Sequence, residues 1–197
     1  MHRRPRLLLT FFLAIYGAAC LVHPGSGGFL DAVDLAIHET GHIVFAPFGE
    51  FVGFAGGTLA QLIMPVVFAL YFWRQGDRHA ATVPAWWFAQ NLWNISVYAA
   101  DARAQLLPLV GGGEHDWAYM LGRLGWLQLD TRIARLIWLA GVLTYVVSVV
   151  AGVRYARAAK AGAAITPEDA VLPDSLPPRP PGPASPPAPA RSRPRRR

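Results

Sequence analysis

The residues of this sequence that are best suited to chemistry are His38-Glu39-Thr40-Gly41-His42, which have the form H-E-x-x-H. On a helix, two histidines four positions apart lie on one face and can bind a single Zn²⁺ ion. The glutamate beside the first histidine can then act as a general base toward a water molecule. The motif therefore predicts Zn²⁺ as the cofactor, His38 and His42 as metal ligands, and Glu39 as the catalytic base.

A third metal ligand must come from elsewhere, because catalytic zinc sites have three protein ligands and one open position. His115 is the first candidate, since imidazole is a good zinc donor and the preceding Gly111-Gly112-Gly113 would let this loop reach the metal. Asp101 is an alternative, because an unpaired carboxylate within an apolar segment is costly. Asp116 is another alternative, since its carboxylate could bind the metal or hold His115 in orientation.

Two further side chains are expected to support the site without binding the metal. Asp34 lies one helical turn before His38 and would orient its ring, and Asn94 lies on a later polar stripe. The plainer interpretations are structural: hydrogen-bonded helix residues for the motif histidines, a loop position for His115, a solvated face for Asp34, and an ion pair with Arg103 or Arg123 for Asp101.

The composition indicates an integral membrane protein. Of the 197 residues, 53% are hydrophobic and 15% are charged, against roughly 25% charged residues in soluble domains. The net charge of +6 comes mainly from the two ends of the chain, and no basic stripe with interleaved aromatic residues is present. The sequence therefore predicts a lipid bilayer as a partner and excludes nucleic acid. Cys20 is the one cysteine, so an intrachain disulfide is excluded.

Apolar periodicity predicts an all-α, polytopic membrane helix bundle of about four to six helices over residues 1–162. The motif helix is expected from Phe29 to Ala46, and Pro47 and Gly49 end it. The other expected elements are crossings at Leu7–Val22, Thr58–Trp73, Pro84–Leu107 and Thr131–Val153, and a short interfacial helix at Trp117–Leu129. Residues 163–197 are expected to be a disordered tail, since eleven of the seventeen prolines lie in Thr166–Arg197.

One of the expected crossings carries a polar stripe. At about 100° per residue, six of its side chains fall within an arc of about 80°: Trp87, Asn91, Asn94, Tyr98, Asp101 and Gln105. Polar groups are costly at membrane depth, so this stripe must face protein or a water-filled cavity.

The basic residues predict an orientation. They prefer the cytoplasmic side, so the basic head, the Arg74/Arg78 loop and the tail are expected in the cytoplasm. The bundle itself is expected in a bacterial inner membrane. Four crossings satisfy this, and the motif helix then lies re-entrant at the outer side. Five crossings are the alternative, which would separate the basic segments. The head also has the form of a signal peptide, but Gly17 stands where a lipoprotein cleavage site carries a large aliphatic residue, which favours an uncleaved helix.

The chain resembles membrane-embedded zinc metalloproteases of the site-2 protease type over roughly residues 30–105. The motif, the later segment Gly56-Gly57-Thr58-Leu59-Ala60-Gln61 that opens a span, and an asparagine-bearing span with an aspartate carry this resemblance. In that family the two motif histidines and an aspartate on a later membrane helix bind zinc, which implies His38, His42 and Asp101 here, with Glu39 as the base. The chain departs from the family pattern, since Asn91-Leu92-Trp93-Asn94 lacks the expected proline and Ala102 replaces the glycine after the aspartate.

These observations predict a membrane-bound zinc metallopeptidase that hydrolyses a peptide bond in a membrane or membrane-adjacent substrate. Two other classes of function fit the sequence. One is a membrane protein that binds metal without catalysis. The other is a small-solute transporter that uses the polar stripe of residues 84–107 as its pathway.

Overall fold

The computed structural model of the protein describes residues 3–25, 28–110 and 113–158. These residues form helices and no strand, so the prediction of an all-α bundle of four to six helices is confirmed. The elements are α1 (Arg3–Val22), α2 (Phe29–Phe45), η1 (Ala46–Phe48), α3 (Glu50–Arg74), α4 (Arg78–Ala100), α5 (Asp116–Arg123), η2 (Leu127–Leu129) and α6 (Asp130–Ala158). The predicted tail, residues 163–197, lies outside the described residues.

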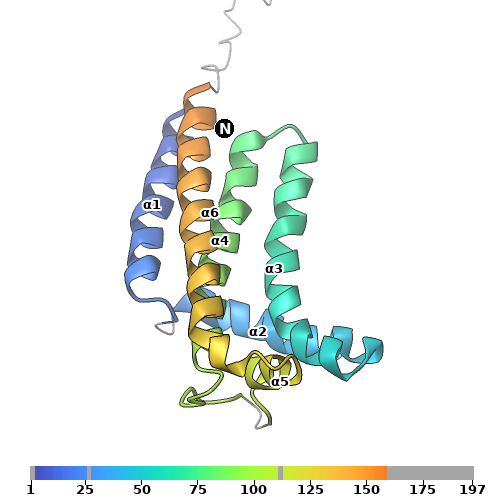
Figure 1. The fold of residues 1–197 in the computed structure, drawn as a ribbon. Coiled ribbons are helices and arrows are strands. Elements are labelled where there is room, and N and C mark those ends of the chain that lie inside the picture. Colours follow the sequence, from blue (N-terminus) through green and yellow to red (C-terminus); the bar gives the residue numbers. More distant parts are fainter. Residues whose placement is uncertain (1–2, 26–27, 111–112, 159–197) are drawn as a thin grey trace, which may run out of the picture. The chain divides into compact units, whose positions relative to one another are not determined.

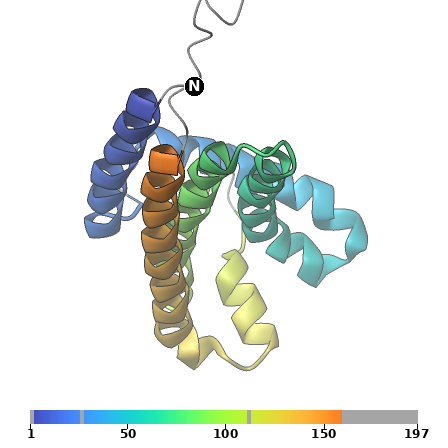
Figure 2. The ribbon, with the colours of Figure 1, turned by 90° about the horizontal axis from the view of Figure 1, so that it is seen from above.

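Four helices stand side by side and two lie across one end of them (Figure 1). The upright helices are α1, α3, α4 and α6, and the view from above shows α4 between α6 and α3 (Figure 2). The motif helix α2 and the short α5 lie at the end where α6 begins. Because α4 is surrounded, it carries more buried residues than any other helix, among them Trp86, Trp93 and Ile95.

Small residues let the upright helices approach one another closely, as is usual between membrane helices. A side chain at Gly17 of α1 would collide with the rings of Tyr145 and Trp86. In the same way, Gly141 of α6 makes room for the indole of Trp93. The aromatic side chains of α4 and α6 therefore fill the spaces that these glycines leave open.

Three helices are long and apolar enough to cross a membrane: α1, α3 and the segment Leu127–Ala158 that contains α6. They show that the chain has the make-up of a membrane protein. The expected crossing Pro84–Leu107 is not among them. The helix at that place, α4, begins at Arg78 and ends at Ala100. It is not apolar throughout, because it carries polar side chains that face the interior of the bundle. With 23 residues it is about 35 Å long, which is still long enough to cross a bilayer.

The helix bounds differ from prediction at both ends of α4. Asp77 caps its start by accepting a hydrogen bond from Ala80 N at 3.0 Å, so the helix begins six residues before Pro84. At the other end, the carboxylate of Asp101 accepts hydrogen bonds from Leu106 N and Leu107 N at 2.9 and 3.0 Å. These bonds turn the chain out of the helix. The expected span Thr58–Trp73 is likewise extended backward to Glu50, so the glycine-rich stretch before it is helical.

At the end away from α2, polar contacts join α1 to the α3–α4 turn. Arg6 pairs with Asp77 at 3.0 Å, and Thr10 Oγ1 and His79 Nε2 lie 3.0 Å apart. Further along, the hydroxyl of Tyr145 donates a hydrogen bond to Ala14 O. Helix α1 therefore packs as a member of the bundle, and its first residues share one end of it with the α3–α4 turn.

Candidate metal centre

The motif helix α2 is held against α3 by two glycines. A side chain at Gly41 would collide with the carbonyl oxygen of Gly56, and a Cβ at Gly56 would lie 2.6 Å from Gly41 O. The chain reverses between the two helices through η1 and Gly49, whose φ of +105° lies in the region that favours glycine. This close approach brings side chains and backbone of α3 within reach of both motif histidines.

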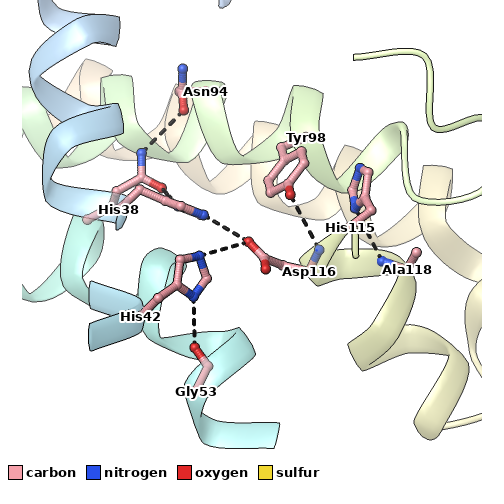
Figure 3. A network of polar contacts seen from close by, with 9 residues as sticks. His38, His42, Gly53, Asn94, Tyr98, His115, Asp116 and Ala118 are labelled. Carbon is pink, nitrogen blue, oxygen red and sulfur yellow. Dashed lines mark hydrogen bonds and ion pairs between the residues drawn. The ribbon is translucent and has the colours of Figure 1, made fainter. Parts of the chain in front are cut away.

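His38 is buried and held at both ring nitrogens (Figure 3). Its Nδ1 lies 2.8 Å from Gln61 Oε1, and its Nε2 lies 2.9 Å from Asp116 Oδ2. A side chain at Gly57 would collide with this ring, so the absence of a side chain there gives the imidazole its place. Burial favours the neutral imidazole, but the hydrogen bonds to Asp116 and Gln61 outweigh burial and raise the pKa of His38.

His42 lies one turn further along the same face. Its Nδ1 donates a hydrogen bond to the carbonyl oxygen of Gly53 at 2.8 Å, and its Nε2 lies 3.2 Å from Asp116 Oδ2. A carbonyl oxygen can only accept, so the proton of the neutral ring is on Nδ1 and the lone pair is on Nε2. This is the arrangement that outer hydrogen-bond partners impose on metal-binding histidines.

Asp116 brings the third donor atom. It is the first residue of α5 and is almost fully buried. Its backbone N–H donates to the hydroxyl of Tyr98 at 3.3 Å, which ties the start of α5 to α4. His38, His42 and Asp116 each offer one donor atom within 4.8 Å of the others, and they form the one such cluster found in the described part of the chain.

The structure does not bring His115 to the two motif histidines, although it was the first candidate for the third ligand. Its side chain caps α5, because Nδ1 accepts a hydrogen bond from Ala118 N at 3.3 Å. Its ring stacks on Tyr98 at 4.2 Å between centroids and is completely buried, and burial lowers the pKa of His115. The glycine-rich loop before it therefore ends in a fixed histidine.

Asp101, the candidate that the family resemblance implies, also lies apart from the cluster. Its carboxylate is engaged by the two backbone N–H groups of the following turn, and its Oδ2 lies 3.6 Å from His115 Nε2. The alternative ion pairs with Arg103 and Arg123 are not formed. Arg103 pairs with Asp130 at 2.7 Å, and Arg123 lies 4.0 Å from Glu50.

The two expected supporting residues have different outcomes. Asn94 donates no bond to a histidine but accepts one from Gln61 Nε2 at 3.3 Å, and Gln61 in turn contacts His38. Asp34 does not orient His38. Its carboxylate accepts from Trp87 Nε1 at 2.8 Å, and burial raises the pKa of Asp34 to about 6. Gln61 takes the role expected of Asp34.

Glu39 lies between two cavities of about 450 and 410 Å³. Both cavities are lined by Glu39, His38 and Tyr98, and also by Leu109 and Val110. The first cavity also reaches His42 and Asp116. The carboxylate of Glu39 is therefore placed beside the cluster and has space next to it for another molecule.

Sequence reasoning did not assign roles to Gln61, the Gly53 carbonyl or Tyr98. A role for Gln61 could have been predicted, because it is an amide within an otherwise apolar span, where polar groups need a partner. The Gly53 carbonyl leaves no signal in the side-chain pattern. A comparison with family models, curated proteins and solved structures finds no match for this chain, so the resemblance to site-2 type proteases stays a prediction.

Proposed function

We propose that this protein is a membrane-embedded zinc metallopeptidase in which His38, His42 and Asp116 bind the metal and Glu39 is the general base. The observation that carries the proposal is the convergence of three donor atoms. The Nε2 atoms of His38 and His42 face the carboxylate Oδ2 of Asp116 at 2.9 and 3.2 Å. In the metal-free protein a proton on His38 can lie between these atoms, and a bound metal ion would take its place with all three groups as ligands.

The donor set suits zinc. Two histidines and a carboxylate, with one position open, are a known catalytic arrangement. The three donor atoms lie within 4.8 Å of one another, and His38, His42 and Asp116 would hold a zinc ion between them. The same donors also serve iron in some oxygenases, and elemental analysis distinguishes the two metals.

A bound zinc ion supplies Lewis acidity to a water molecule and to the carbonyl of a substrate. Glu39 accepts the proton that the water loses, and it can later return this proton to the leaving amine. The Gly53 carbonyl and Gln61 hold the two imidazole rings in place throughout. Leu109 and Val110 line both cavities and give the space beside Glu39 an apolar wall.

The substrate is proposed to be a peptide or a membrane protein that becomes extended near the membrane surface. The cluster lies at one end of the upright helices, where α2 crosses them (Figure 1). A site at this depth can receive a segment that unwinds from a membrane helix. The cavities on both sides of Glu39 fit residues on both sides of a scissile bond.

The basic residues favour a cytoplasmic position for the opposite end. Within the described residues, the arginines at the end away from α2 are Arg3, Arg4, Arg6, Arg74, Arg78, Arg154 and Arg157, against Arg103, Arg123, Arg132 and Arg135 at the α2 end. We infer from this distribution that the metal centre lies on the outer side of the membrane, and we propose that this membrane is a bacterial inner membrane.

The transporter interpretation is less well supported by the contacts. It needs the polar stripe of α4 to line a pathway, yet Trp87 and Asn94 are engaged by Asp34 and Asp31 of α2. A metal-binding protein without catalysis would use the same cluster, so the two are separated by experiment.

The test compares Glu39→Gln with His38→Ala in detergent-purified protein. Glu39→Gln keeps the size and hydrogen-bonding capacity of the side chain but removes the base, so zinc content is expected to stay while peptide hydrolysis falls about 10²–10⁴-fold. His38→Ala is expected to lose both. His23→Ala, an exposed histidine outside the cluster, is the control and should keep both. Wild-type hydrolysis by Glu39→Gln would contradict the role of Glu39 as the base. Zinc binding without hydrolysis by the wild type would leave only the metal-binding interpretation.

A further inference from the structure

A line of hydrogen bonds leads from His38 to a carboxylate two amides away. Gln61 Oε1 lies 2.8 Å from His38 Nδ1, and Gln61 Nε2 donates to Asn94 Oδ1 at 3.3 Å. Asn94 Nδ2 then donates to Asp31 Oδ1 at 3.2 Å. The line passes from α2 to α3, to α4 and back to α2, and Figure 3 shows its part from His38 to Asn94.

Asp31 gives this line a direction. It accepts hydrogen bonds from Gly28 N at 3.0 Å and from Gln90 Nε2 at 3.1 Å, as well as from Asn94. A carboxylate can only accept, whereas an amide side chain can face its neighbour with either its oxygen or its nitrogen. The carboxylate is therefore the one member of the line whose polarity is fixed by its chemistry.

The direction passes along the line one group at a time. Asn94 must turn its nitrogen to Asp31 and hence its oxygen to Gln61. Gln61 must then turn its nitrogen to Asn94 and its oxygen to His38. An oxygen at this place requires a proton on His38 Nδ1, so Nε2, the atom that faces Asp116 and His42, is the ring nitrogen left to give up its proton and bind a metal.

We propose that Asp31 is a positioning residue that sets the tautomer of His38 through Asn94 and Gln61, and thereby keeps His38 Nε2 available to a metal ion. This proposal rests on the proposed function in that the metal is the ligand that uses this lone pair. His42 needs no such line, because a backbone carbonyl fixes its tautomer directly. The two ligands of the motif are thus oriented by different devices.

Asp31→Asn reverses the line without changing its shape. The new amide can present its oxygen to Gly28 N and its nitrogen to Asn94, which then turns its own nitrogen to Gln61. Gln61 would turn its nitrogen to His38 Nδ1 and place the proton of the ring on Nε2, against the metal. Loss of an outer partner of this kind costs about 10–100-fold in metal affinity, and we expect that loss of zinc affinity for Asp31→Asn.

The second variant separates this role from a structural one, because Asp31 also accepts from the backbone at the start of α2. In the double variant Asp31→Asn/Gln61→Glu, the new carboxylate can only accept, from His38 on one side and from the turned Asn94 on the other. It restores the proton to His38 Nδ1 while leaving the start of α2 as in the single variant. We expect the double variant to recover most of the zinc affinity.

The experiment measures zinc affinity of the full chain in detergent and, in metal-free protein at alkaline pH, the histidine tautomers by ¹⁵N chemical shifts. The expected result is a protonated His38 Nδ1 in the wild type, an unprotonated Nδ1 in Asp31→Asn, and a protonated Nδ1 again in the double variant. Wild-type affinity in Asp31→Asn, or a loss that the double variant does not repair, overturns the proposal. If the wild type binds no zinc, the proposed function fails, and the tautomers alone then decide whether Asp31 has this role.

Discussion

The space beside His38 allows a sharp test of how the centre is built. Gly57 lies on α3 against this ring, and a Cβ at this position would collide with its Nε2, Cδ2 and Cε1 atoms. The ring has little freedom to move away, because Gln61 holds Nδ1 at 2.8 Å and Asp116 faces Nε2 at 2.9 Å. Gly57→Ala should therefore displace His38 Nε2 from the other two donors.

The expected change in stability is small. Replacing glycine by alanine within a helix stabilises it by roughly 0.5–1 kcal/mol, and overpacking costs about 1–3 kcal/mol, so the net loss lies between about 0 and 2.5 kcal/mol. The change in metal binding is larger. Displacing a ligand should cost at least the 10–100-fold in affinity that the loss of an outer partner costs. The zinc affinity should thus fall by at least this factor in a protein that still folds.

The assay combines thermal unfolding in detergent with zinc titration of the metal-free protein. Gly122→Ala is the matched control, because Gly122 is also helical and a Cβ there meets nothing within 4 Å. The control should bind zinc as the wild type does and unfold at the same temperature or slightly higher. Zinc affinity of wild-type strength in Gly57→Ala would refute the packing of His38 described here.

Three further variants test other parts of the account. Asp116→Ala should release zinc, whereas His115→Asn, which keeps a capping side chain for α5, should retain it; the reverse pattern of metal content would restore His115 as the third ligand. Asp34→Asn should flatten the pH dependence of stability. In the wild type the raised pKa of Asp34, about 6, means that the stability gained from its protonated carboxyl is fully present below about pH 4 and is lost as pH rises through about 6, a loss of about 3 kcal/mol. Unfolding temperatures of both proteins across this range would reveal the difference. Gly17→Leu should lower the unfolding temperature, since the new side chain collides with Tyr145 and Trp86 and overpacking costs about 1–3 kcal/mol; an unchanged temperature would contradict the packing of α1 in the bundle.

Much of the fold could be predicted from periodicity and from helix-ending residues. The motif helix was expected to end at Ala46 and ends at Phe45, because Pro47 and Gly49 are strong local signals. The expected crossing begins at Pro84, whereas α4 begins at Arg78. The true start depends on the capping carboxylate of Asp77, a weaker sequence signal than the proline seven residues later.

The third ligand shows where sequence reasoning ends. His115 and Asp116 are neighbours, and both carry suitable donor atoms. The choice between them depends on how α5 begins: His115 turns its ring back to cap the helix, and Asp116 then points to the motif histidines. This choice requires the register of α5 against Tyr98, which side-chain periodicity does not contain. In the same way, Gln61 meets His38 only because Gly41 and Gly56 let α2 and α3 touch.

The most direct test of the central claim is the metal content of the wild-type chain, purified in detergent without chelators after growth with zinc and iron both supplied. The account predicts about one zinc ion per chain, because three donors converge on one position between α2 and α5. Protein that contains no metal, or that contains iron in place of zinc, would contradict it.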